Sequence, residues 1–186
     1  MVLLVGIVSA FVRNANGPAD PYLAPDSATG TSPTLASMPN RGARTPFEAF
    51  AEVGFTITAA SAQELKEAEE RCALLADTAV LQAKGMMEQS GFAGYKGMIF
   101  KFESENSAAF FMKNTRIPLS IAFFDSDGAF VSSADMEPCP DEVLDCPVYG
   151  ADRPYLYALE VPKGDLPTLG VVAGSTLALS SGGCSG

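Results

Sequence analysis

The sequence predicts a mainly β, β-rich α+β domain, built as a jelly-roll-like β-sandwich or a partly open barrel with one or two short helices. Three observations predict this class. Short apolar runs recur at roughly ten-residue spacing, Gly- and Pro-containing turns separate them, and only two short stretches carry helix signals. The chain has 186 residues, of which 47% are hydrophobic, enough for one packed domain with flanking segments.

The elements are expected in the following order. Ser61 and Glu64 form a capping-box pattern before a short helix at residues 62–70. Asp77 or Thr78 can cap a helical turn that ends at Gly85, and the segment 125–128 (DSDG) predicts a hairpin turn. Strands are expected at residues 53–58, 71–76, 97–102, 107–112, 119–124, 129–133, 155–161 and 176–179. The side chains expected to face the core are Phe100, Phe102, Phe110, Met112, Ile121, Phe123, Leu159 and Val161.

The N-terminal part differs in composition from this domain. Residues 1–13 are apolar up to Arg13 and resemble a signal-peptide core or an anchor, although the run is shorter than the roughly 20 residues of a membrane span. No basic residue precedes the run, so a signal reading requires a start codon further upstream; an apolar N-terminus on a cytoplasmic protein is the alternative. Residues 14–46 are rich in Pro, Gly, Ala and Ser and predict a flexible tether. The domain is expected at 47–182, with a tail at 183–186.

The charge and composition exclude several function classes. The chain has no His and no Trp, which excludes a Ser-His-Asp or Cys-His centre and a His-ligated metal. The formal net charge of −10 repels phosphate backbones and anionic lipid, so nucleic acid is not an expected partner. A neutral or cationic partner fits better, and membrane association is expected only through the apolar N-terminus.

Four sequence blocks resemble the domain of unknown function 192 family, over about residues 71–179. The segment from Met112 to Thr115 (MKNT), at its spacing from the following strand, is the most specific of them. The resemblance implies a compact jelly-roll-like β-sandwich with a minor helix, often behind an export signal, and no established activity. The phrases CALLADT, PLSIAFFD and DMEPC are most similar to the actinobacterial branch, which favours an envelope setting. The blocks are residues 84–87 (KGMM), 97–102 (GMIFKF), 110–125 (FFMKNTRIPLSIAFFD) and 158–164 (ALEVPKG).

Polar residues at strand ends are the candidate ligand-binding groups. After an apolar strand, Lys113, Asn114 and Thr115 bring a cation, an amide and a hydroxyl to the expected mouth of the sandwich, where such groups orient a ligand. Asp125 and Glu160 are the nearest acidic candidates. The alternative is structural, because Asn and Thr hydrogen-bond the local backbone and can simply shape a strand end.

Cofactor and metal patterns are weak. Gly85 and Gly97 lack the spacing of phosphate-binding loops, and no cofactor is expected. The acidic segment 135–145 lacks the spaced ligands of a calcium loop, and no metal site is expected. Two carboxylates acting as a general acid and base remain an open alternative. The acids that such a pair would draw on are Asp125, Asp135, Glu137 and Glu160.

Four cysteines give an even number, typical of disulfides in an exported chain. Cys139 and Cys146 enclose a short, Pro-flanked loop and are the expected local pair. Cys72 and Cys184 remain, and their pairing would join the first strong strand to the Gly-rich tail. A free tail thiol and ordinary thiols in a cytoplasmic protein are the alternatives.

These observations predict an exported, extracellular or cell-envelope binding or accessory module without catalytic activity, with cytoplasmic localisation as the alternative. Its partner would be a small molecule, a glycan or an envelope protein. The alternative function is a carboxylate-dependent hydrolase that acts on an envelope or extracellular substrate.

Overall fold

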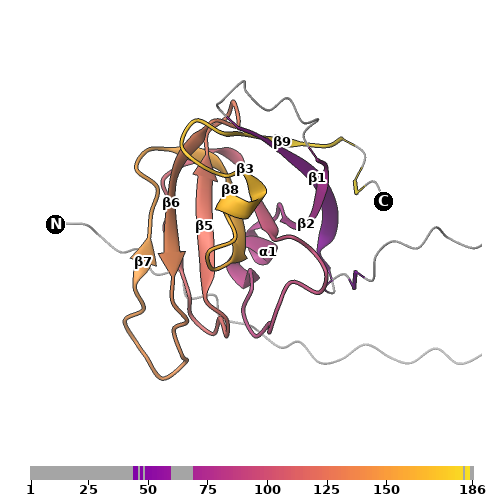
Figure 1. Cartoon of the computed structure of the whole chain (residues 1–186). Coiled ribbons are helices and arrows are strands. Elements are labelled where there is room, and N and C mark those ends of the chain that lie inside the picture. The colour runs from indigo at the N-terminus through magenta and orange to yellow at the C-terminus, as the bar shows by residue number, and fades with distance from the viewer. Residues whose placement is uncertain (1–43, 46, 48, 60–68, 182, 185–186) are drawn as a thin grey trace, which may run out of the picture. The chain divides into compact units, whose positions relative to one another are not determined.

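The computed structural model describes residues 44–45, 47, 49–59, 69–181 and 183–184. Within these ranges the chain is mainly β, with one short α-helix and one 3₁₀ turn (Figure 1). No helix of the described part is long and apolar enough to cross a membrane. The elements are β1 (Ala51–Thr58), β2 (Arg71–Ala76), α1 (Ala79–Lys84), β3 (Met98–Asn106), β4 (Phe110–Phe111), β5 (Leu119–Phe124), β6 (Phe130–Met136), β7 (Val148–Tyr149), β8 (Tyr155–Pro162), η1 (Pro167–Leu169) and β9 (Thr176–Leu179).

Seven strands form one strongly curled sheet in the order β6-β5-β8-β3-β2-β1-β9 (Figure 1). All neighbours are antiparallel except β2 and β3, which are parallel. The two edges meet at one end, where Ala129 and Thr176 form an isolated bridge. There Leu177 N donates to Gly128 O at 2.8 Å. The predicted β-rich class is confirmed, in its partly open barrel form.

Gly128 allows this close approach of the two edges. Its φ is +76°, and a Cβ at this position would lie 2.1 Å from Leu177 O. A side chain here would push the edges apart, because that distance is far below van der Waals contact. The predicted turn at 125–128 therefore also closes the barrel.

The curled sheet buries side chains on both of its faces. The concave face joins strands from both ends of the sheet, including Phe55 of β1, Phe124 of β5 and Leu177 of β9, and η1 adds Leu169. The convex face carries a second apolar cluster, which includes Phe100 and Phe123. Because β5 and β8 lie between two apolar layers, their sequences are apolar almost throughout.

Most of the side chains predicted to face the core are fully buried. They divide between the two layers, with Leu159 and Val161 on the concave side and Phe100, Met112, Ile121 and Phe123 on the convex side. Phe102 and Phe110 are only half-buried. The reason is that they line a cavity, which is described below.

Several element bounds differ from the sequence-based expectation. The strand expected at 107–112 is only two residues long, and its partner β7 was not predicted because two residues show no periodicity. The strand expected at 97–102 extends to Asn106. The helix expected at 62–70 lies outside the described residues apart from Glu69 and Glu70, which are not helical.

The cysteines approach each other in the two predicted pairs. The Cα atoms are 5.4 Å apart for Cys72 and Cys184 and 5.9 Å apart for Cys139 and Cys146, within the range of disulfide-bonded residues. The first pair links β2 to the tail beyond β9. The second closes residues 139–146, the acidic loop, which carries Asp141, Glu142 and Asp145.

Candidate functional site

A cavity of about 190 Å³ lies on the convex side of the sheet, under α1. Its walls come from three segments that follow one another in the sequence: α1 with the turn that follows it, β3, and the connection around β4. One residue of β8 completes it. The lining residues are Gln82, Ala83, Lys84, Gly85, Met86, Met87, Phe100, Phe102, Ala108, Ala109, Phe110, Phe111, Thr115 and Glu160.

Local capping places α1 over the cavity. Thr78 Oγ1 accepts a hydrogen bond from Leu81 N at 3.3 Å, and Gly85 ends the helix with its N–H bonded to Leu81 O at 2.8 Å. Gln82 Nε2 donates to Lys101 O at 2.8 Å and so ties the helix to β3. Both caps follow the predicted pattern.

Phenylalanine rings form much of the cavity wall. Phe100 is fully buried, and its ring lies 4.9 Å from that of Phe110 in a T-shaped arrangement. The ring of Phe102 packs edge-on against that of Tyr155, with 5.5 Å between the ring centroids. Phe111 is 50% exposed, and with other exposed lining residues it marks where the cavity opens to solvent.

Glu160 is the buried acid of this cavity. It is only 5% exposed and pairs through its backbone with Met98 on β3 and Ile121 on β5. Its Oε2 has no hydrogen-bond partner among the described residues. Burial raises the pKa of the carboxyl to about 8, because an apolar environment disfavours the charged form. With no ligand bound, the carboxyl is therefore largely protonated at neutral pH.

Thr115 is the second predicted site residue that lines the cavity. It is buried, and its backbone N donates to Met112 O at 3.0 Å in the turn after β4. The structure therefore brings together Thr115 and Glu160, which are 45 positions apart in the sequence.

Lys113 and Asn114 do not line the cavity. Lys113 Nζ donates to Asp141 O at 2.6 Å and Val143 O at 2.7 Å, and so holds the acidic loop. Asn114 adopts a left-handed conformation with φ +55°, and its backbone N donates to Cys139 O at 3.0 Å. These contacts match the structural alternative, in which the segment shapes a strand end.

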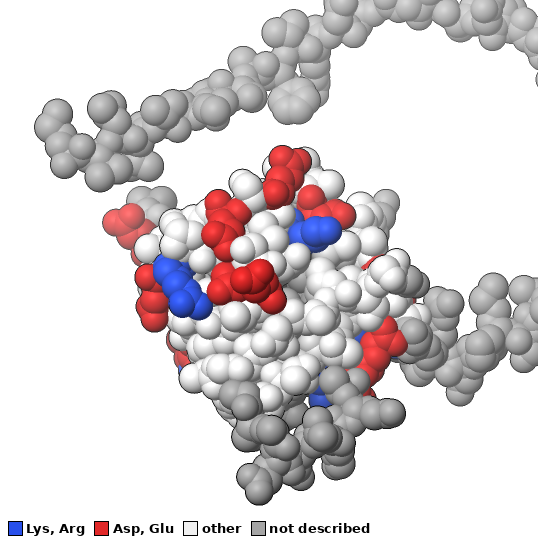
Figure 2. Space-filling view, turned by 90° about the horizontal axis from the view of Figure 1, so that it is seen from above, with Lys and Arg blue, Asp and Glu red and all other residues white. Residues whose placement is uncertain are grey.

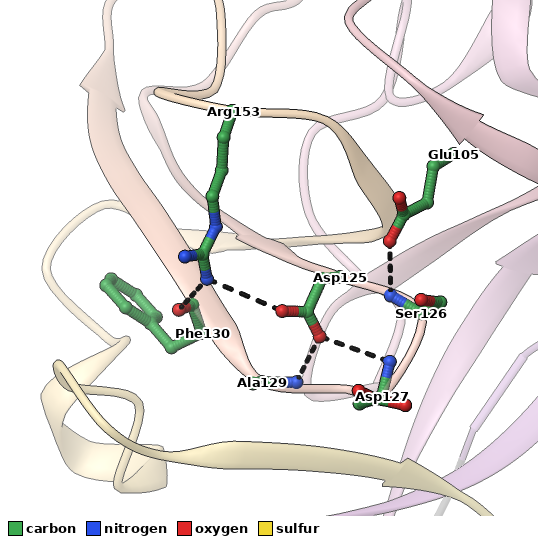
Figure 3. A network of polar contacts seen from close by, with 7 residues as sticks. All are labelled: Glu105, Asp125, Ser126, Asp127, Ala129, Phe130 and Arg153. Atoms are coloured by element: carbon green, nitrogen blue, oxygen red, sulfur yellow. Dashed lines mark hydrogen bonds and ion pairs between the residues drawn. The ribbon is translucent and has the colours of Figure 1, made fainter.

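Asp125 lies in the hairpin turn between β5 and β6 (Figure 3). Its Oδ1 accepts from Asp127 N at 3.1 Å and Ala129 N at 2.9 Å, and its Oδ2 lies 3.4 Å from an Arg153 nitrogen. Beside it, Glu105 accepts from Ser126 N at 2.9 Å, and this bond lowers the pKa of the Glu105 carboxyl. Asp125 thus stabilises a turn and is not a lining residue of the cavity.

Sequence reasoning missed most of the cavity wall. Gln82 and Lys84 fell in the expected helical turn, and Phe102 and Phe110 were assigned to the core. Three of these four residues also lie in the family-like blocks, but none was expected to line a cavity. The one available signal was the group of four phenylalanines between residues 100 and 111, which lie on the two strands β3 and β4. Among the described residues, no group of three or more potential ligand side chains could hold a metal ion.

The sequence and the fold are similar to those of known proteins. Residues 61–179 match the model of the domain of unknown function 192 family, described as Uncharacterized ACR. A crystal structure of a protein of unknown function from Novosphingobium aromaticivorans DSM 12444 is 27% identical, covers 80% of this chain and 99% of that chain, and has a TM-score of 0.58. The crystal structure of a putative transcription regulator from Sinorhizobium meliloti 1021 is 25% identical to this chain and has a TM-score of 0.59. The match covers 70% of this chain and 95% of that chain. No curated protein matches the chain.

Proposed function

The chain belongs to the domain of unknown function 192 family, and we propose that its domain is a noncatalytic binding module that holds a small, mainly apolar ligand in the cavity at Glu160. The observation that carries this proposal is the unpaired Oε2 of Glu160 at the wall of a mainly apolar cavity. Cavities of this kind, with few convergent polar groups, are typical ligand sites.

The energetic argument concerns the unpaired oxygen. A buried polar atom without a partner costs about 1–3 kcal/mol, so native proteins rarely leave one unsatisfied. A ligand that bonds Glu160 would remove this cost and cover the phenylalanine rings at the same time. The volume of about 190 Å³ suits a ligand somewhat larger than benzene, which binds in an apolar cavity of about 150 Å³.

The geometry favours binding over hydrolysis. Two-carboxylate hydrolysis needs a second acid facing the first across the substrate, and Glu160 is the single acid among the described lining residues. The other acidic candidates are engaged elsewhere: Asp125 in its turn, Asp135 with Ser120 Oγ at 2.5 Å, and Glu137 with Lys163.

Binding to this cavity is testable with benzyl alcohol, a neutral probe of suitable size. In a ¹H–¹⁵N NMR titration of the full chain, we expect the shifted amides to cluster at residues 82–87, 108–115 and 160. Phe111→Ala should weaken binding several-fold because it removes an aromatic wall. Val172→Ala is the matched control at a similarly exposed apolar residue that does not line the cavity. Shifts centred on other residues, or equal effects of both variants, would contradict the proposal.

We also propose that this module works outside the cytoplasm, in the envelope or beyond it. The apolar residues 1–13, the tether-like composition of residues 14–46 and the two cysteine pairs at bonding distance support this proposal. The ligand-binding domain would then be held away from a membrane by the segment 14–46.

Nonreducing peptide mapping tests this location. In protein recovered from its native compartment, we expect two linked peptide pairs, Cys72 with Cys184 and Cys139 with Cys146, because an oxidising compartment preserves disulfides. The same map after reduction is the control. Four free thiols in the native material would refute both disulfides and the extracytoplasmic location.

A further inference from the structure

The polar groups of the cavity are unevenly distributed. Its most buried polar residue is Glu160, 5% exposed. Four of its lining residues are phenylalanines, and the single basic lining residue among those described, Lys84, is exposed on α1. Such a site discriminates between ligands by their charge as well as by their shape.

We propose that the ligand of this cavity is an organic cation, in which an ammonium group on a small apolar or aromatic body uses the Glu160 carboxylate as its counter-ion. This inference rests on the proposed binding function and adds the chemical class of the ligand. Three independent features of the described residues support it.

The first feature is the fixed position of Glu160. β8 lies between β3 and β5 with backbone pairing on both sides, which fixes the side chain on the cavity side of the sheet, where Glu160 is 5% exposed. An ammonium group would give its unpaired oxygen a charge-assisted hydrogen bond, which is about twice as strong as a neutral one. Removing water from around the pair strengthens it further.

The second feature is the set of four rings in the wall. Phe100, Phe102, Phe110 and Phe111 all line the cavity, and the face of an aromatic ring attracts a cation through its quadrupole. The same rings cover the apolar body of the ligand. A carboxylate together with aromatic rings therefore favours a cation over an anion of equal size.

The third feature is the charge of the protein. The net charge is −10, and on the face shown in Figure 2 acidic side chains outnumber basic ones. An acidic surface raises the local concentration of cations and speeds their association. The positive charge of Lys84 opposes this attraction only weakly, because Lys84 is exposed and dissolved salt screens exposed charges.

Cation binding requires Glu160 to lose its proton. The protonated carboxyl and the ammonium ligand give an ion pair, and one proton passes to the buffer. The elements packed around the carboxyl contribute Gln82, Lys84 and Thr115 to the cavity, and its backbone neighbours Met98 and Ile121 carry no charge. Since burial raises the pKa of Glu160 to about 8, affinity should fall on the order of 50-fold between pH 8 and pH 6.

Calorimetric titration of the full chain with three matched probes tests the inference. We expect benzylamine to bind at least tenfold more tightly than benzyl alcohol at pH 8, and benzoate to bind more weakly than either. Repeating the benzylamine titration at pH 7 in two buffers of different ionisation enthalpy should show release of close to one proton. Glu160→Gln should abolish the preference for benzylamine and the release while still binding benzyl alcohol, which also shows that the variant is folded. Glu142→Gln, which removes the same charge from the exposed acidic loop, should change neither.

The outcomes separate the two proposals. If benzyl alcohol or benzoate binds as tightly as benzylamine, the cation inference is overturned and the binding function stands. If benzylamine is preferred equally by Glu160→Gln, Glu160 is not the counter-ion and the inference is overturned as well. If no probe binds, the proposed binding function fails, and this inference fails with it.

Discussion

Glu160→Gln should raise the free energy of unfolding by about 3 kcal/mol at pH 7 and remove most of its pH dependence between pH 5 and 8. The wild-type carboxyl is protonated in the folded protein, where burial raises its pKa from 4.5 to about 8. In the unfolded chain it ionises in water. Folding at pH 7 must therefore take up a proton, which glutamine does not require.

The sign follows from the proton count. Between about pH 5 and 8 the native state holds a proton that the unfolded state has lost, so wild-type stability falls by about 1.4 kcal/mol per pH unit as pH rises. Below this window both states are protonated, and the penalty disappears. The absence of histidine makes the window unusually clear of other titrating side chains.

Urea unfolding at several pH values from 5 to 8 measures this slope. Glu142→Gln is the matched control, because Glu142 lies in an exposed loop and its replacement should leave the slope unchanged. A wild-type free energy of unfolding that stays constant from pH 5 to 8 would show that Glu160 is ionised and solvated in the folded protein.

Phe123→Ala should lower the free energy of unfolding by about 3–5 kcal/mol. Phe123 is completely buried in the convex-face cluster. Its ring lies 4.8 Å from that of Tyr155 and 5.8 Å from that of Phe110. Truncation would leave a void among rings that the paired strands β5 and β8 hold apart, so the surroundings cannot collapse to fill it.

Phe111→Ala is the matched control, because the same truncation at a half-exposed ring should cost less than about 1 kcal/mol. Chemical denaturation with the disulfides intact measures both variants. A loss below about 1 kcal/mol for Phe123→Ala would mean that neighbouring side chains fill the void without strain. The burial of Phe123 would then contribute little to the free energy of unfolding.

The strands that the sequence predicted well share one property. Residues 71–76, 119–124 and 176–179 are apolar runs bounded by turn or polar residues, and their ends agree with β2, β5 and β9. The two-layer packing could not be predicted, because a run such as LSIAFF is apolar at nearly every position and does not show which side chain faces which layer.

The candidate site was predictable only in part. Thr115 was named from a polar position at a strand end and Glu160 as a nearby acid, and both line the cavity. Glu160 was named beside Asp125 because both are acidic, yet one is buried and the other stabilises a turn. Burial depends on which strands become neighbours, and the pairing of β8 with both β3 and β5 leaves no trace in the local sequence.

The neighbouring positions of β1 and β9 determine when this domain can fold during synthesis. Phe55 of β1 pairs with Leu179 of β9, so the first described strand emerges from the ribosome long before its partner is made. Until then Phe55 and Ile57 lack the strand that covers them, and the barrel edges cannot meet at Ala129 and Thr176. Since long-range pairing must wait for both strands, the barrel can close only after β9 has been synthesised.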